Sequence, residues 1–115
     1  MTPAAMTPRD LAGRLELAGD AATVTLVGEL DLAVAEELES LLGQAIGAGR
    51  PRTVVEMEAV THIDSTAMRV LLDAHRRAVA RGRMLVLRNL RGEPRTLTRL
   101  AGLHLTLVLE DAPGL

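Results

Sequence analysis

The chain of 115 residues has no cysteine, no aromatic residue and no lysine. The lack of cysteine excludes disulfide bonds and thiolate chemistry. The lack of aromatic rings removes the surfaces on which bases and sugars stack, so the core and any interface must consist of Leu, Val, Ile, Met and Ala. All thirteen basic residues are arginines, and they are interspersed with fifteen acids to give a formal net charge of -2. Because no basic stripe results, direct binding to nucleic acid is not expected.

The sequence also has no pattern typical of metal binding or of membrane insertion. The three histidines have no second histidine at zinc-ligand spacing and no partner thiols, so we expect neither a metal site nor a cofactor. Every apolar stretch is interrupted by Glu, Asp or Arg well short of the roughly 18 residues of a membrane span, so no membrane insertion is expected. The N-terminal residues lack the apolar run of a signal peptide, which favours a cytoplasmic location.

The length and the apolar content of 48% suit one modest core and therefore one domain. Residues 1–10 have two prolines and small side chains but no periodicity. We predict that they form a flexible leader before a domain at 11–112. No heptad seam or long unpaired apolar edge is visible, so we expect a monomer.

The periodicity of apolar residues predicts the order of helices and strands. Alternation of apolar and polar residues predicts an antiparallel hairpin of strands at 13–17 and 22–29. Helical spacing then predicts a helix from Val34 to Ala48, with Asp31 as its N-cap. The remaining elements are a strand at 53–59, a helix after Asp64, a strand at 84–87, a helix at 95–100 and a strand at 105–109. The order β-β-α-β-α-β-α-β predicts an α/β fold, with helices packed against a mixed, largely parallel sheet of about five strands.

Two of these segments carry predictions about burial. In the strand at 53–59, the period of two residues separates two faces, which are Thr53, Val55, Met57 and Ala59 on one side and Val54, Glu56 and Glu58 on the other. In the second helix, the predicted apolar face consists of Met68, Leu71, Leu72, Ala78 and Val79.

The stretch V-T-H-I-D-S-T-A-M-R-V-L-L at 60–72 passes from an apolar strand through a polar turn into this second helix. It contains Ser65, one of only two serines in the chain. Either Asp64 or Ser65 is predicted to be the helix N-cap. A serine hydroxyl at a helix start is exposed beside the positive end of the helix dipole, which tolerates an added phosphate. A simple capping role is the alternative.

The residues His62, Asp64 and Ser65 are those of a hydrolase triad, but the surrounding sequence argues against catalysis. No G-x-S-x-G elbow surrounds Ser65, no glycines flank it to form an oxyanion hole, and no phosphate-binding G-x-x-x-x-G-K motif is present. We therefore do not expect an enzyme. A binding surface is favoured, with Met68 as an apolar anchor and Arg69 as a directional charge, and the alternative is that Met68 is ordinary core.

Three stretches together resemble the STAS domain family, in particular the single-domain anti-sigma factor antagonists of bacteria. G-E-L-D at 28–31 resembles the family's second strand and the start of its first helix, and T-V-V-E-M-E-A-V-T-H-I-D-S-T at 53–66 resembles its third strand and phosphorylation turn. Residues 88–103 are similar to its variable loop and third helix, so the resemblance covers about residues 13–110. Glu56 stands where the family usually has Asp, His62 where it has an aromatic residue and Ala67 where it has Gly.

The resemblance implies that Ser65 is phosphorylated by a serine kinase that doubles as an anti-sigma factor. The unphosphorylated chain would bind this kinase and release a sigma factor, and a phosphatase would be a further partner. The residues that would contact the partner are Asp31, Asp64, Ser65, Thr66, Met68 and Arg69. Ala67, less permissive than Gly, would either limit the approach of the kinase or mark a member that is no longer phosphorylated.

The second reading of the resemblance is a constitutive adaptor subunit of a lipid-transport ABC complex. In that role Ser65 or Thr66 would be a contact with the transporter ATPase and not a switch.

Overall fold

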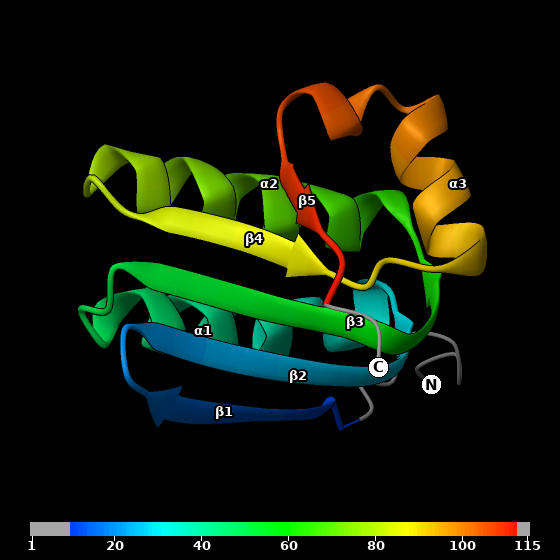
Figure 1. Ribbon diagram of the computed structural model, residues 1–115. Coiled ribbons are helices and arrows are strands. Elements are labelled where there is room, and N and C mark those ends of the chain that lie inside the picture. Colours follow the sequence, from blue (N-terminus) through cyan, green and yellow to red (C-terminus); the bar gives the residue numbers. More distant parts are fainter. Residues whose placement is uncertain (1–9, 113–115) are drawn as a thin grey trace.

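The computed structural model of the protein describes residues 10–112, and the leader expected at the N-terminus lies outside them apart from its last residue. Through the described part of the chain, strands and helices follow the predicted order, with two added 3-10 turns (Figure 1). The elements are β1 (Ala12–Ala18), β2 (Ala21–Leu30), η2 (Leu32–Val34), α1 (Ala35–Gly47), β3 (Arg52–Ile63), α2 (Ser65–Ala80), β4 (Met84–Arg88), α3 (Gly92–Leu100), η3 (Leu103–Leu105) and β5 (Val108–Glu110).

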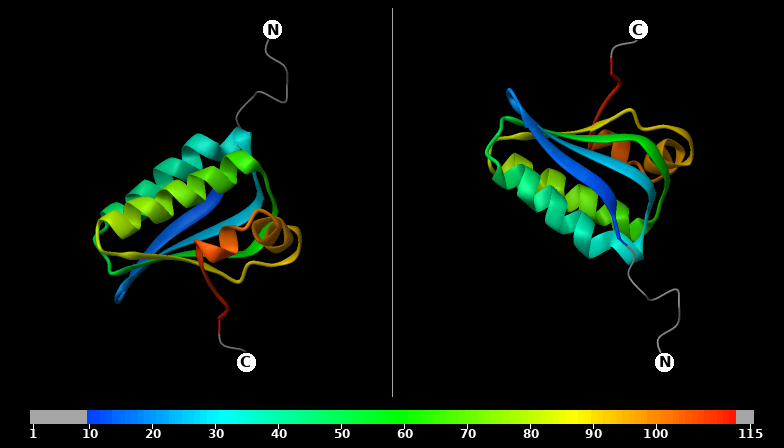
Figure 2. Two further views of the ribbon diagram at one scale, coloured as in Figure 1. Left: turned by 90° about the horizontal axis from the view of Figure 1, so that it is seen from above. Right: turned by 90° about the horizontal axis from the view of Figure 1, so that it is seen from below.

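The five strands form one sheet in the order β1-β2-β3-β4-β5. The hairpin of β1 and β2 is antiparallel, and β2 to β5 run parallel to one another, so the predicted mixed and largely parallel sheet is confirmed. Each parallel connection leads to the neighbouring strand. The helices α1 and α2 of the first two connections lie side by side on the same face of the sheet, whereas α3 lies apart, at one end (Figure 2).

The core lies between the sheet and the pair α1 and α2. Alternate residues of β2, among them Val24 and Leu26, are fully buried against the helices. Leu38 and Leu42 of α1, one turn apart on the same side of the helix, are also fully buried. The apolar periodicity that predicts β2 and α1 is therefore also the periodicity of the faces that pack in the core.

The strand β3 is longer than predicted and does not keep its alternation. Thr53, Val55 and Met57 are buried as expected, but Ala59 is exposed and Val60 is buried in its place. The reason is a register shift between β2 and β3, where Thr25 pairs with Glu56 but Val27 pairs with Ala59. The additional residue on β3 reverses which side chains face the helices, as a β-bulge does.

The apolar face of α2 also differs from the prediction at one position. Ala67, Leu71, Ala74 and Ala78 form the buried stripe, and Met68 and Leu72 pack partly against it. Val79 is 56% exposed, because it lies about 100° around the helix from Ala78 and beyond the edge of the stripe.

The final strand was expected at 105–109 but is shorter and begins later. Gly102 has a φ of 73°, in the left-handed region, and the chain then makes the 3-10 turn η3 before it reaches the sheet. Leu105 in this turn is 83% exposed. Only Val108–Glu110 pairs with β4.

Candidate functional site

Two loops meet where the parallel strands β2 and β3 end at the same edge of the sheet (Figure 1). The first loop contains Asp31 and Leu32, and the second is the turn that leads through Asp64 into α2. The backbone N–H of Asp64 donates to the carbonyl oxygen of Leu30 over 3.0 Å, so the two loops are hydrogen-bonded neighbours. The structure thus brings together residues that lie more than thirty positions apart in the sequence.

Asp64 is the N-cap of α2, which decides between the two capping residues that the sequence allowed. One carboxylate oxygen, Oδ1, accepts from the backbone N–H of Ala67 at 2.9 Å. The other, Oδ2, accepts from the backbone N–H of Leu32 at 3.1 Å. A single carboxylate therefore caps the helix and fastens the loop after β2 to it, so the part that Asp64 plays in this structure is to position the two loops.

Ser65 is the first residue of α2, and its side chain is exposed. Its Oγ has no hydrogen-bond partner within residues 10–112, since Asp64 serves as the cap. The hydroxyl therefore stands free beside the N–H groups of the first helical turn, which have no partners within the helix and carry partial positive charge. An anionic group attached to this oxygen would be electrostatically favoured there.

The other predicted partner residues of α2 differ in exposure. Arg69 is exposed, and it lies one turn beyond Ser65 on the same side of the helix. Thr66 and Met68 are half-buried. Met68 packs partly against the core, as one of its two readings expected, and its role as an apolar anchor for a partner stays a prediction. Ala67 is fully buried. Its methyl group therefore offers a kinase no surface, so any limit that Ala67 sets on the approach of a kinase would have to act through the backbone of the turn, and this expectation stays a prediction.

The loop after β2 contributes a cap and an exposed apolar side chain. Asp31 accepts from the backbone N–H of Ala33 at 3.0 Å and is the N-cap of the 3-10 turn η2. This turn precedes α1, so Asp31 is not the N-cap of α1 that the sequence predicted. Leu32 is 60% exposed at the start of this turn. Sequence reasoning missed Leu32. The signal that could have found it was its position, because Leu32 is an apolar residue that precedes the helical periodicity beginning at Val34.

His62, near the end of β3, is held by a residue from another element. Its Nδ1 lies 2.5 Å from a carboxylate oxygen of Glu93, in the first turn of α3. The hydrogen bond with Glu93 raises the pKa of His62 above its ordinary value of 6.5, and the negative charges of Glu29 and Asp64 add to this effect, against a smaller opposing effect of burial. The pair links α3 to the strand that leads into the Ser65 turn.

The residues His62, Asp64 and Ser65 do not form a catalytic triad. Nδ1 of His62 is engaged by Glu93, and both oxygens of Asp64 accept from backbone N–H groups. In the part of the chain that the structure describes, no hydrogen bond joins any two of these three side chains. A catalytic triad requires one hydrogen bond between the serine and the histidine and another between the histidine and the aspartate, and within residues 10–112 both are missing.

Residues 10–112 contain no group of three or more His, Cys, Asp or Glu side chains that could hold a metal ion. None of their helices is long and apolar enough to cross a membrane.

Comparison with known proteins identifies relatives of the whole domain. The sequence profile of the STAS domain matches residues 14–112. The structure is similar to an anti-sigma factor antagonist from Mycobacterium paratuberculosis, with a TM-score of 0.75 and 25% identity over 92% of this chain and 88% of that one. No curated protein sequence matched the chain.

Two further solved structures show the same fold at lower identity. The Bacillus cell fate determinant SpoIIAA in its phosphorylated form has a TM-score of 0.70 and 24% identity, over 89% of this chain and 92% of that one. A sulfate transporter family protein from Wolinella succinogenes has a TM-score of 0.71 and 19% identity, over 83% of this chain and 80% of that one. The fold is thus shared by regulators and by a transporter-family protein, and the site must distinguish between these roles.

Proposed function

Because the chain belongs to the STAS domain family, we propose that it is an anti-sigma factor antagonist controlled by phosphorylation of Ser65. In this proposal the unphosphorylated monomer binds an anti-sigma factor serine kinase in the cytoplasm, and the sigma factor held by that kinase is released. Phosphorylation of Ser65 by the kinase ends the interaction, and a phosphatase restores it. The protein itself catalyses no reaction. The similarity to antagonists of this class supports the proposal.

The observation that carries the proposal is the state of the Ser65 hydroxyl. It is exposed at the first position of α2, and because Asp64 supplies the cap, it is not needed to hold the helix. A kinase can therefore reach and modify it without breaking a hydrogen bond within residues 10–112. Thr66, the neighbouring hydroxyl residue, is half-buried, so we expect it to be modified little or not at all.

A phosphate on Ser65 should leave the fold in place. It adds about -1.5 to -2 charges at pH 7, and negative charge at a helix N-terminus is stabilising. The exposed Arg69, one turn further on the same side of α2, supplies an additional positive charge nearby. The modified domain is therefore expected to keep its structure and its unfolding temperature.

The same phosphate should disrupt the contact with a partner. Leu32 is exposed on the loop that is hydrogen-bonded to Asp64, the residue before Ser65, and would provide an apolar contact for a partner that binds there. Binding through this surface would remove water from the phosphate next to the carboxylate of Asp64. An unpaired desolvated charge costs several kcal/mol, so the phosphorylated chain should bind the kinase much more weakly.

The test is to incubate the full chain with the anti-sigma factor kinases encoded in its source genome and to measure modification and binding. Mass spectrometry should place the phosphate on Ser65, and calorimetry should show tight binding only for the unmodified chain. Ser65→Ala should bind persistently, and Ser65→Glu should bind weakly. Ser40, the second serine, is also exposed on a helix, so Ser40→Ala and Ser40→Glu are the matched controls and should behave like the wild type.

Three results would count against the proposal. A phosphate on Thr66 would assign the switch to another residue. Equal affinity of the phosphorylated and unmodified chains would leave the constitutive transporter adaptor as the better interpretation. Failure of every kinase to bind the unmodified chain would remove the anti-sigma factor as the partner.

A further inference from the structure

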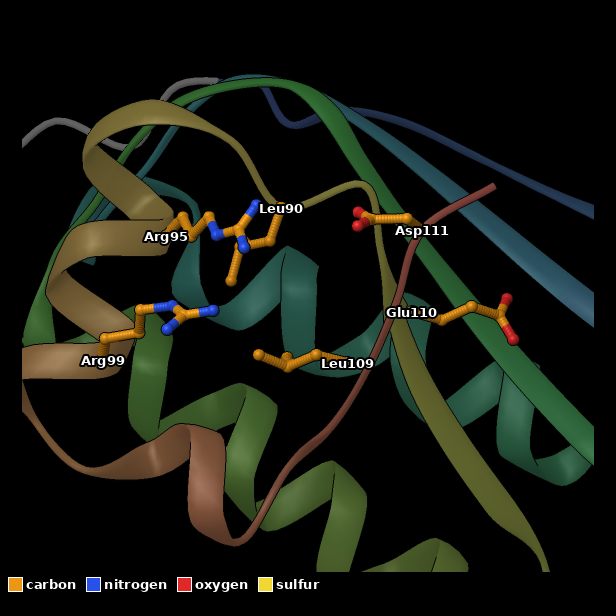
Figure 3. Close-up of a pocket in the computed structure, with 6 residues that line it drawn as sticks. All are labelled: Leu90, Arg95, Arg99, Leu109, Glu110 and Asp111. Carbon is orange, nitrogen blue, oxygen red and sulfur yellow. The ribbon is translucent and has the colours of Figure 1, made fainter. Parts of the chain in front are cut away.

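A second candidate site lies away from Ser65, between α3 and β5. It is a cavity of about 210 Å³ lined by Leu90, Arg95, Arg99, Leu109, Glu110 and Asp111 (Figure 3). None of these residues belongs to the surface proposed to bind the kinase. The proposed contact with a kinase therefore does not account for this cavity.

Two arginines of α3 dominate one side of the cavity. Arg95 and Arg99 are four residues apart, so their side chains leave the helix on the same side, and both extend toward β5 (Figure 3). Neither guanidinium group forms an ion pair or a hydrogen bond with any residue of the described range 10–112. Each keeps its full set of donors, which match the oxygens of phosphate and carboxylate groups.

The acids on the opposite side are already neutralised by other arginines. Glu110 accepts from Arg52 and from Arg88, each at 2.9 Å. Asp111 accepts from Arg91 at 2.9 Å. Three arginines thus balance these two carboxylates from outside the cavity, and the charges of Arg95 and Arg99 remain uncompensated. The electrostatic potential in the cavity should consequently favour an anion.

The wall formed by the end of β5 is held in place by Asn89. This residue has a φ of 58°, in the left-handed region, and its backbone N–H donates to the carbonyl oxygen of Glu110 at 2.9 Å. Its side chain accepts from the backbone N–H of Ala112 at 2.9 Å and donates to Glu56. These bonds fix the loop after β4 to the segment that carries Glu110. A preformed wall lowers the entropic cost of binding a ligand.

We propose that this cavity binds a small phosphate-type anion, held by the guanidinium groups of Arg95 and Arg99. Leu90 is buried and Leu109 half-buried, and together they give the cavity an apolar side. The anion is either free phosphate or a phosphate group carried on a small organic molecule whose apolar part lies on these leucines. The helix α3 also carries Glu93, the partner of His62, so it contacts the strand that leads into the Ser65 turn.

The test is a titration of the full chain, labelled for NMR, with sodium phosphate and separately with phenyl phosphate, while sodium chloride keeps the ionic strength constant. Saturable shifts should appear in the backbone signals of Leu90, Arg95, Arg99 and Leu109. Equal affinity for the two probes would indicate a site for free phosphate, and tighter binding of phenyl phosphate would indicate a ligand with an organic part. Both outcomes support the proposed anion chemistry.

The double variant Arg95→Gln/Arg99→Gln should weaken binding of either probe by more than about tenfold, because it removes two charge-assisted contacts. Arg77→Gln/Arg81→Gln is the matched control. These two arginines have the same spacing and are also exposed, and their replacement changes the net charge equally. An equal loss of affinity in the control would show general charge attraction and overturn the proposal, as would the absence of saturable shifts in the wild type. Neither result would bear on Ser65.

Discussion

Removal of the Asp64 carboxylate should destabilise the domain more than removal of any ordinary surface acid, because each of its oxygens holds a different segment. Asp64→Ala loses the helix cap to Ala67, which costs about 1 kcal/mol. It also loses the charge-assisted bond to the N–H of Leu32, which costs about 1 to 2 kcal/mol at this partly solvated site. The sum is about 2 to 3 kcal/mol, which for a domain of this size lowers the unfolding temperature by about 8 to 12 °C.

Thermal unfolding followed by circular dichroism measures this loss directly. Asp73→Ala is the matched control, because Asp73 is an exposed aspartate on the same helix whose nearest ion-pair contact, with Arg76, is long at 3.8 Å. Its replacement should change stability by no more than about 0.5 kcal/mol. Asp64→Asn should lie between the two, since an amide oxygen still caps the helix. If Asp64→Ala unfolds at the same temperature as Asp73→Ala, the carboxylate does not fasten the two loops.

Two further predictions concern residues close to Ser65. The pKa of His62 is raised by Glu93, so protonated His62 stabilises the fold fully below about pH 6.5, and this contribution is lost as the pH rises through the folded-state pKa. NMR titration should show that Glu93→Gln lowers the pKa of His62, and an unchanged value would contradict the pairing. Ala67→Gly should destabilise the domain by about 1 to 2 kcal/mol, because it removes a fully buried methyl group and helix propensity, without changing the rate of phosphorylation of Ser65. A faster modification would mean that the backbone at position 67 does limit the kinase.

The sequence alone determined the features that depend on residues close together in the chain. The order of strands and helices, the hairpin and the capped start of α2 before an exposed serine all follow from local periodicity and turn chemistry. Even here the choice between Asp64 and Ser65 as the cap stayed open, because both side chains suit the position.

Tertiary structure alone decided what depends on the pairing of distant segments. The register shift between β2 and β3 moves Val60, and not Ala59, into the core, and no period of two residues on a single strand can reveal the partner strand's register. The bonds from Asp64 to the loop after β2 and from His62 to Glu93 join residues 32 and 31 positions apart. The cavity beside Arg95 exists only because the end of β5 returns to the loop after β4, which brings its neutralised acids opposite two unpaired guanidinium groups.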